Sequence, residues 1–286
     1  MNSKLALPER VIVFGATGLV GNKLSHQMER LGILVKRPRL RIQTQSLKNE
    51  RKIKKVISDF LPDAVVNCAA IIGTQKCLEN IKLAETVNHW LPEMIGSECD
   101  SVGSFMLHLS TEAVFRSAKL GELMSIEDLP EPETIYGLTK FTGEKSVLQW
   151  SNNLVVRLPR VFDWEKQLIG TLCRRLLEKG EIKVAQDVMS TPISANSAAT
   201  HLVDLLLRHK KPELAPQLIH LTGDTYISLY DLMLFLTPPT FHSNIKPVQH
   251  DYFGSSKEPP LLNAGLLSQP KYTIPLTSSK ETFFNG

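Results

Sequence analysis

The chain has 286 residues, of which 42% are hydrophobic and 22% are charged, and its net charge is +4. This composition is typical of a globular protein with one large domain or two joined domains, and it argues against collagen-like, disordered and coiled-coil chains. No apolar stretch approaches the roughly 18 residues that a membrane span requires. Residues 8–10 are Pro-Glu-Arg, where a signal peptide would be apolar, so we expect a cytoplasmic protein without a membrane partner.

The positive charge is concentrated in one segment. Residues 36–55 contain nine Lys and Arg residues and one Glu, so this segment carries a net charge of +8 and the rest of the chain −4. Surfaces that bind nucleic acid usually combine basic with aromatic residues, and this segment has no aromatic residue. We therefore expect no nucleic-acid partner. The four cysteines and eight histidines form no metal-binding motif, which predicts reduced thiols and no bound metal.

Strands and helices are predicted to alternate over the first 158 residues. Short apolar runs predict buried parallel strands at 10–14, 33–35, 64–67, 105–109 and 154–158. The helical spacing of apolar residues predicts helices at 19–31, 48–60, 78–96 and 136–150. This alternation indicates an α/β fold, a Rossmann-type doubly wound parallel sheet with helices on both faces.

The pattern changes after residue 158, because 11 of the 17 prolines lie in the last 128 residues and interrupt long elements. Helices are predicted at 168–179, 195–209 and 229–236, and short strands at 182–184 and 218–221. We therefore expect an NAD(P)-binding Rossmann domain over residues 1–158 and a smaller mixed α/β substrate-binding lobe over residues 159–286. Whether the two interleave is left open.

A glycine-rich turn lies between the first predicted strand and the first predicted helix, where residues 15–21 are Gly-Ala-Thr-Gly-Leu-Val-Gly. Glycines allow a tight turn and a close approach of the backbone to a pyrophosphate, which then lies at the helix N-terminus. In this context the pattern predicts a dinucleotide site, with a purely structural turn as the alternative. The candidate binding residues are Gly15, Thr17, Gly18, Leu19, Val20 and Gly21.

The end of the second predicted strand indicates which dinucleotide binds. An NAD site usually has an acidic residue there, to accept hydrogen bonds from the ribose hydroxyls. Residues 35–41 are instead Val-Lys-Arg-Pro-Arg-Leu-Arg, without a carboxylate. Such cations can pair with the 2′-phosphate of NADP, so we favour NADP(H) over NAD(H), with Arg37 as the best candidate. A solvated basic loop is the alternative.

Tyr136 and Lys140 are four residues apart on a predicted helix and therefore lie on one face. A neighbouring ammonium lowers the pKa of a phenol and lets it exchange a proton. Alone, this spacing is common by chance. It gains meaning from Ser110 and Thr111, which follow the strand at 105–109, because a hydroxyl at this edge of the sheet can polarise a carbonyl. The small residues of Asn67-Cys-Ala-Ala70 would let a flat cofactor lie against the backbone.

These motifs together resemble the extended short-chain dehydrogenase/reductases, and most closely the dTDP-4-dehydrorhamnose reductase (RmlD-like substrate-binding) family. The matching segments are GATGLVG (15–21), NCAA (67–70), STEAVF (110–115) and YGLTK (136–140) with GEK (143–145). The resemblance implies a catalytic set of Thr111, Tyr136 and Lys140. It further implies cofactor contacts from Gly18, Leu19, Val20, Ala69, Ala70, Ile71, Tyr136 and Lys140. As substrate-binding residues we predict Ser110, Thr111, Glu112 and Arg160.

Two departures from the family pattern bear on the substrate. Ala113 stands where the family often has an aromatic residue, and residues 157–162 are Arg-Leu-Pro-Arg-Val-Phe where rhamnose reductases commonly have Arg-Thr-Ser-Trp-Val-Tyr. Arg160 could pair with a diphosphate or a carboxylate, so the identity of the sugar is left open.

The leading hypothesis is an NADPH-dependent reductase of a nucleotide-linked 4-keto-6-deoxy sugar, as in dTDP-rhamnose and polysaccharide biosynthesis. In this reaction Tyr136 would protonate the C4 oxygen, Lys140 would lower the pKa of Tyr136 and hold the ribose, and Thr111 would orient the carbonyl. An epimerase or dehydratase with tightly bound NAD is one alternative. The other is a non-catalytic NADP-binding regulatory subunit, like that of methionine adenosyltransferase in the same family. A homodimer is left open.

Overall fold

The computed structural model describes residues 8–41, 44–164, 167–208, 217–253 and 263–277. Its centre is a parallel sheet with the strand order β11-β6-β4-β3-β1-β2 in the described part of the chain. The strands are β1 (Arg10–Phe14), β2 (Leu34–Lys36), β3 (Ala64–Asn67), β4 (Phe105–Thr111), β6 (Asn153–Leu158) and β11 (Leu218–His220). The chain adds β2 on one side of β1 and then adds β3, β4, β6 and β11 on the other side, so the strand order switches between β1 and β3. The predicted Rossmann-type fold is confirmed.

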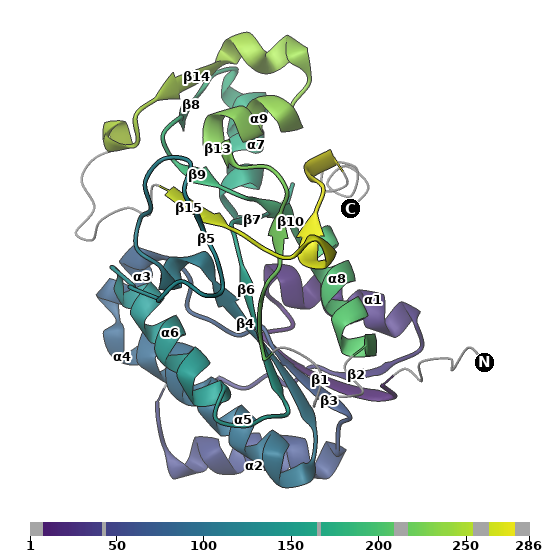
Figure 1. The fold of residues 1–286 in the computed structure, drawn as a ribbon. Coiled ribbons are helices and arrows are strands. Elements are labelled where there is room, and N and C mark those ends of the chain that lie inside the picture. The colour runs from purple at the N-terminus through teal and green to yellow at the C-terminus, as the bar shows by residue number, and fades with distance from the viewer. Residues whose placement is uncertain (1–7, 42–43, 165–166, 209–216, 254–262, 278–286) are drawn as a thin grey trace.

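The sheet is covered by helices on both faces (Figure 1). Alternate residues of β1 point to opposite faces, so Val11 and Val13 pack with α1 and α8, whereas Ile12 and Phe14 pack with the helices of the other face. The first face carries α1 (Leu19–Arg30) and α8 (Ala195–Arg208), and the second carries α2 (Leu47–Phe60), α5 (Leu91–Val102) and α6 (Ile135–Val147).

The prediction of a single helix at 78–96 is wrong. The structure has α3 (Thr74–Glu79), α4 (Ile81–Glu85), a π-helical turn at Thr86–Trp90, and then α5. Asn80 interrupts the helix and caps α4 by accepting a hydrogen bond from the backbone N–H of Leu83. Pro92 has no N–H to donate to the carbonyl of Asn88, and the N–H of Leu91 reaches back to the Thr86 carbonyl instead.

Two elements that were predicted within the second lobe lie in the first. Strand β11 extends the central sheet by pairing with β6, and α8 packs against α1 with its apolar face in the same core. The division of the chain at residue 158 therefore stays a prediction, and these contacts favour its interleaved form.

The smaller lobe lies at the carboxyl ends of the central strands, because β6 leads directly into β7 and β11 into β12. Its own hydrophobic core joins α7 (Gln167–Lys179) and α9 (Leu229–Leu236) to the parallel pair β8 (Ile182–Ala185) and β14 (Ile245–Val248). A mixed sheet has the order β13-β9-β15-β5. The remaining bounds are β5 (Leu123–Met124), β7 (Val161–Phe162), β9 (Met189–Ser190), β10 (Ile193–Ser194), β12 (Thr222–Gly223), β13 (Ile227–Ser228), β15 (Asn263–Leu266) and β16 (Thr273–Ile274).

No helix in the described residues has the length and apolar character that crossing a bilayer demands. The four cysteines all lie in described segments, and no disulfide joins them there. Within the same segments, no three side chains of His, Cys, Asp or Glu gather in a way that could hold a metal ion.

Candidate active site

A cavity of about 740 Å³ lies between the carboxyl ends of the central strands and the smaller lobe. The predicted site residues that line it are Gly15, Thr17, Gly18, Leu19, Val20, Gly21, Ala69, Ala70, Ser110, Thr111, Glu112, Tyr136, Lys140 and Arg160. Arg37 and Ile71 do not line this cavity among the described residues. The fold thus brings the glycine-rich turn, the Tyr-x-x-x-Lys pair and the end of β4 to one space.

The glycine-rich turn needs glycine for two reasons. Gly15 has φ +76°, and a Cβ on it would lie 2.5 Å from the backbone nitrogen of Ala69. A Cβ on Gly21 would lie 2.5 Å from the carbonyl oxygen of Gly15. Helix α1 then begins after Gly18, and no side chain of the described residues caps it there. Its first N–H groups can therefore donate hydrogen bonds to an anion in the cavity.

Ile71 is not among the described residues that line the cavity, and its backbone is held by Asn88 of the π-helical turn. The side-chain amide of Asn88 accepts a hydrogen bond from the N–H of Ile71 at 2.8 Å and donates one to its carbonyl at 3.0 Å. The same amide donates to Thr139 Oγ1 on α6 at 3.1 Å. Asn88 is fully buried, so it fixes the loop after β3 against α6.

Thr111 and Tyr136 lie side by side in the cavity. Thr111 ends β4, where its Oγ1 accepts a hydrogen bond from the N–H of Ala113, and Tyr136 lies in the first turn of α6. Burial raises the pKa of the Tyr136 phenol to about 12, although a hydrogen bond with the Thr111 side chain opposes this rise. The sequence predicted the opposite direction, on the assumption that the ammonium of Lys140 would dominate.

Lys140 is directed to the sheet. Its Nζ donates a hydrogen bond to the Leu109 carbonyl at 2.6 Å and lies 3.2 Å from Nε2 of His108. Its side chain is almost fully buried, and this burial lowers the pKa of Lys140 to about 8 although the carboxylate of Glu144 opposes the change. The Lys140 ammonium is therefore easier to deprotonate than an ordinary lysine, and it does not outweigh the burial that raises the pKa of Tyr136.

A buried ion pair joins β6 to α6. The guanidinium of Arg157 on β6 donates two hydrogen bonds to Glu144, from Nε at 3.0 Å and from Nη2 at 2.8 Å. It also covers the ring of Phe115, 4.9 Å from the centroid. Its Nη1 lies 3.4 Å from Nε2 of His220 on β11. The sequence analysis quoted Arg157 and Glu144 within motifs but did not predict that they pair.

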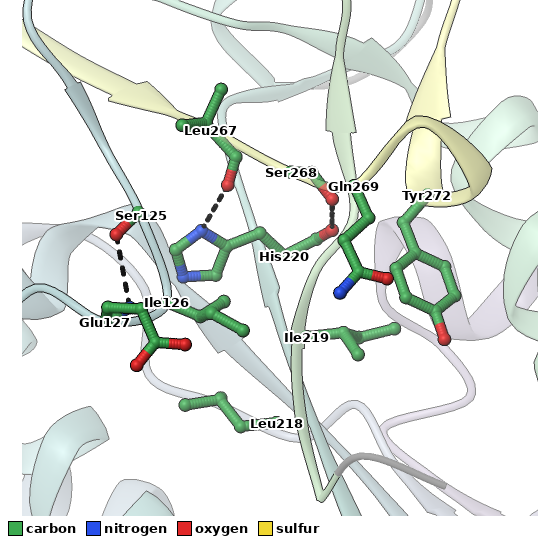
Figure 2. Close-up of a pocket in the computed structure, with 10 residues that line it drawn as sticks. All are labelled: Ser125, Ile126, Glu127, Leu218, Ile219, His220, Leu267, Ser268, Gln269 and Tyr272. Carbon is green, nitrogen blue, oxygen red and sulfur yellow. Dashed lines mark hydrogen bonds between the residues drawn. The ribbon is translucent and has the colours of Figure 1, made fainter.

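His220 also lines a second, smaller cavity of about 250 Å³ at the edge of the sheet (Figure 2). Its Nδ1 donates to the Leu267 carbonyl at 3.0 Å, because a carbonyl oxygen can only accept. Burial and Arg157 lower the pKa of His220 to about 4, so the ring is neutral. The ring is thereby turned so that Nε2 accepts from Arg157. This cavity lies apart from the glycine-rich turn and contains none of the predicted site residues.

Glu112 and Ser110 differ in how far they are engaged. The carboxylate of Glu112 accepts hydrogen bonds from Ser190 Oγ at 2.9 Å and from the N–H of Arg160. Burial raises the pKa of Glu112 to about 7, and the Arg160 charge opposes this rise. Glu112 therefore bridges β4 to the smaller lobe. Ser110 lines the cavity, and its Oγ is buried and has no hydrogen-bond partner in the described structure.

Arg37 contacts two residues of α1. Its Nη2 donates to Glu29 at 2.6 Å and lies 3.5 Å from Nδ1 of His26. The Nζ of Lys36 lies over the ring of Phe60, 5.1 Å from its centroid. The structure thus places both cations at the end of β2, beyond the cavity, and the reading of a 2′-phosphate by Arg37 stays a prediction.

Comparison with known proteins identifies the family of the chain. The family model described as the RmlD substrate binding domain matches residues 9–263. The chain is 23% identical over 265 residues to methionine adenosyltransferase 2 subunit beta of Xenopus laevis, covering 87% of this chain and 78% of that protein. It is 27% identical over 231 residues to dTDP-4-dehydrorhamnose reductase of Escherichia coli K12, covering 77% and 75%.

A crystal structure of dTDP-4-dehydrorhamnose reductase from Bacillus anthracis in complex with NADP has the same fold. The TM-score is 0.85, the sequences are 20% identical, and the match covers 98% of this chain and 99% of that one. The resemblance predicted from the motifs is confirmed: the chain belongs to the RmlD substrate binding domain family.

Proposed function

We propose that the protein is an NADPH-dependent reductase of a nucleotide-linked 4-keto-6-deoxy sugar. The observation that carries this proposal is the meeting of Thr111, Tyr136 and Lys140 with the glycine-rich turn in one cavity. The relative from Escherichia coli named dTDP-4-dehydrorhamnose reductase supports the same class of reaction.

The residues at the cavity fit a dinucleotide. Gly15 has no side chain and lies close to the backbone of Ala69, and the uncapped start of α1 offers N–H groups to a pyrophosphate. Ala69 and Ala70 present small side chains beside it. When bound, the nicotinamide would supply the hydride that adds to the carbonyl carbon of the sugar. Arg37 would favour the 2′-phosphate of NADPH after exchanging its contact with Glu29.

The chain's own residues act on the carbonyl oxygen. Thr111 holds this oxygen by a hydrogen bond, and a substrate contact from Ser110 stays a prediction. Tyr136 donates its phenolic proton to the oxygen as the negative charge develops, which completes the hydroxyl and leaves a phenolate. Because the pKa of Tyr136 is about 12, the proton stays on the phenol until a stronger base, the developing alkoxide, takes it. The guanidinium of Arg160 pairs with the diphosphate of the substrate.

Loss of NADPH absorbance on addition of dTDP-4-keto-6-deoxyhexose tests the proposal. Wild-type protein and Tyr230→Phe, which alters a tyrosine against the core of the smaller lobe, should both oxidise NADPH. Tyr136→Phe should lose at least about a hundredfold in turnover and keep its affinity for NADPH. Equal turnover by Tyr136→Phe would remove Tyr136 as the proton donor.

A regulatory role without turnover is the second candidate, since a relative that matches 87% of this chain is named as a subunit of methionine adenosyltransferase. In that case the wild-type protein would bind NADPH but would reduce no keto-sugar. Isothermal titration with NADPH beside the absorbance assay separates the two candidates.

A further inference from the structure

His108 is a buried histidine that none of the sequence motifs included. It lies on β4 directly opposite Asn67 on β3, so the two side chains share one face of the sheet. Its Nδ1 lies 3.1 Å from Nδ2 of Asn67, and its Nε2 lies 3.2 Å from Nζ of Lys140. The ring is fully buried. It therefore connects the end of β3 to the lysine of the candidate active site.

The direction of these hydrogen bonds follows from a backbone group. The N–H of Ala69 can only donate, and it donates to Oδ1 of Asn67 at 3.1 Å. This bond identifies the amide oxygen, so the amide nitrogen of Asn67 is the atom that faces His108. Because an amide nitrogen only donates, Nδ1 of His108 accepts and carries no proton.

The single proton of the His108 ring must then be on Nε2. Burial and the nearby Lys140 lower the pKa of His108 well below its usual 6.5, so the ring is neutral and has one N–H. This N–H points to Nζ of Lys140. An ammonium has no lone pair and cannot accept it, whereas an amine can accept it and still donate to the Leu109 carbonyl.

We propose that Asn67 and His108 form a positioning pair that stabilises the neutral amine form of Lys140 in the unliganded protein, by donation of the His108 Nε2 proton to Nζ. Neither residue touches the reacting atoms in this role. Each acts through the protonation state of Lys140.

The other groups around Lys140 are compatible with an amine. Glu144 lies one turn further along α6 and raises the pKa of Lys140, but its charge is paired with Arg157 and burial outweighs it. Cys68, at the end of β3, is an uncharged thiol because burial raises its pKa to about 12. Tyr136, one turn before, is an uncharged phenol. Glu112, at the end of β4, has a pKa of about 7 and is bonded to Ser190.

A consequence for the site rests on the proposed function. If Lys140 must be an ammonium to hold the ribose and stabilise the Tyr136 phenolate, it takes up a proton when NADPH binds. Because the pKa of Lys140 in the unliganded protein is about 8, the uptake should be largest above pH 8. Calorimetric titration in buffers of different ionisation enthalpy would measure it.

The first test reads the tautomer directly in the unliganded full-length protein. Long-range ¹H–¹⁵N spectra of protein with ¹⁵N-labelled histidine distinguish protonated from bare ring nitrogens, and His108→Gln assigns the signals. We expect the proton of His108 on Nε2. His220 is the internal control, since its contacts with Leu267 and Arg157 predict the opposite tautomer, with the proton on Nδ1. A proton on Nδ1 of His108 would overturn the proposal.

The second test titrates the ¹³Cε signal of Lys140 in protein with labelled lysine, assigned with Lys140→Met. Asn67→Asp makes residue 67 an acceptor, moves the ring proton to Nδ1 and turns Nε2 into an acceptor, so the pKa of Lys140 should rise by about one unit or more. The added charge alone is measured by making the same change beside His108→Leu. Equal shifts of the Lys140 pKa in the two backgrounds would contradict the proposal. If a variant fails to fold, the wild-type histidine spectrum of the first test still decides. Neither test uses a substrate, so both stand apart from the reductase proposal.

Discussion

The two sides of the cavity are held in place by different kinds of contact. On the side of the glycine-rich turn, backbone lies against backbone, so that Gly15 leaves no room for a Cβ beside Ala69. On the side of the smaller lobe, buried polar side chains join segments that are far apart in the chain, as when Glu112 meets Ser190. The first side is therefore sensitive to added volume, and the second is sensitive to a lost partner or a changed charge.

The largest effect is expected where a buried charge loses its partner. Arg157→Met leaves the carboxylate of Glu144 buried and unpaired, which should lower the free energy of unfolding by about 3 to 5 kcal/mol. The double variant Arg157→Met/Glu144→Leu removes both charges and should recover most of this loss. Urea unfolding of the wild type and both variants measures it. If the single variant is no less stable than the double one, the pair does not act as a unit.

Added volume at the turn should have the next largest effect. Gly15→Ala combines a positive φ with a Cβ 2.5 Å from the nitrogen of Ala69, and should lower the free energy of unfolding by about 2 to 4 kcal/mol. It should also abolish NADPH binding as followed by cofactor fluorescence. Gly32→Ala is the matched control, because it has φ +81° but its Cβ would meet no described atom within 4 Å. It should lose only about 1 kcal/mol and keep its affinity for NADPH.

The side of the cavity with the glycine-rich turn could be predicted from the sequence. A short apolar strand, a glycine-rich turn and a helix stand next to each other in the chain, and their geometry follows from a few neighbouring residues. The positions of Thr111, Tyr136 and Lys140 around the cavity also followed, because they lie where a parallel strand ends and where the next helix begins.

The contacts between segments that are far apart in the chain could not be predicted in this way. The pairing of β11 with β6 joins residues about 60 positions apart, and no local pattern distinguishes an edge strand of the main sheet from one of the smaller lobe. Arg157 and Glu144 find each other only once β6 lies beside α6. His108 did leave a signal, since a histidine two residues before Ser110 in an apolar strand lies on the same face as Ser110.

A smaller, pH-dependent effect is expected from Glu112 on the polar side. Its pKa in the folded protein is about 7, against 4.5 for an ordinary Glu, so the folded state binds more protons between these values. By linkage, the stability that this carboxyl contributes is full below pH 4.5 and is lost as the pH rises to about 7. Urea unfolding at pH 5 and pH 8 should therefore show a larger loss for the wild type than for Glu112→Gln. Equal losses would mean that Glu112 does not titrate in this range.

The smallest effect is expected for the preference between NADPH and NADH, at the end of β2 on the side of the glycine-rich turn. Arg37→Asp should shift the ratio of the Kd values for NADPH and NADH by about tenfold toward NADH, because a carboxylate repels the 2′-phosphate and accepts from ribose hydroxyls. Arg51→Asp, which makes the same change at an exposed position of α2, should leave the ratio unchanged.

The contact with Glu29 sharpens this prediction. Arg37 donates to Glu29 at 2.6 Å, so the arginine must give up part of this contact before it can bind a phosphate. Glu29→Gln removes the competing charge and should tighten NADPH binding by a few-fold, without a change in the affinity for NADH, at low ionic strength where exposed charges are least screened. If Glu29→Gln changes both affinities equally, or if Arg37→Asp and Arg51→Asp act alike, the basic segment attracts the cofactor by its general charge and Arg37 does not read the 2′-phosphate.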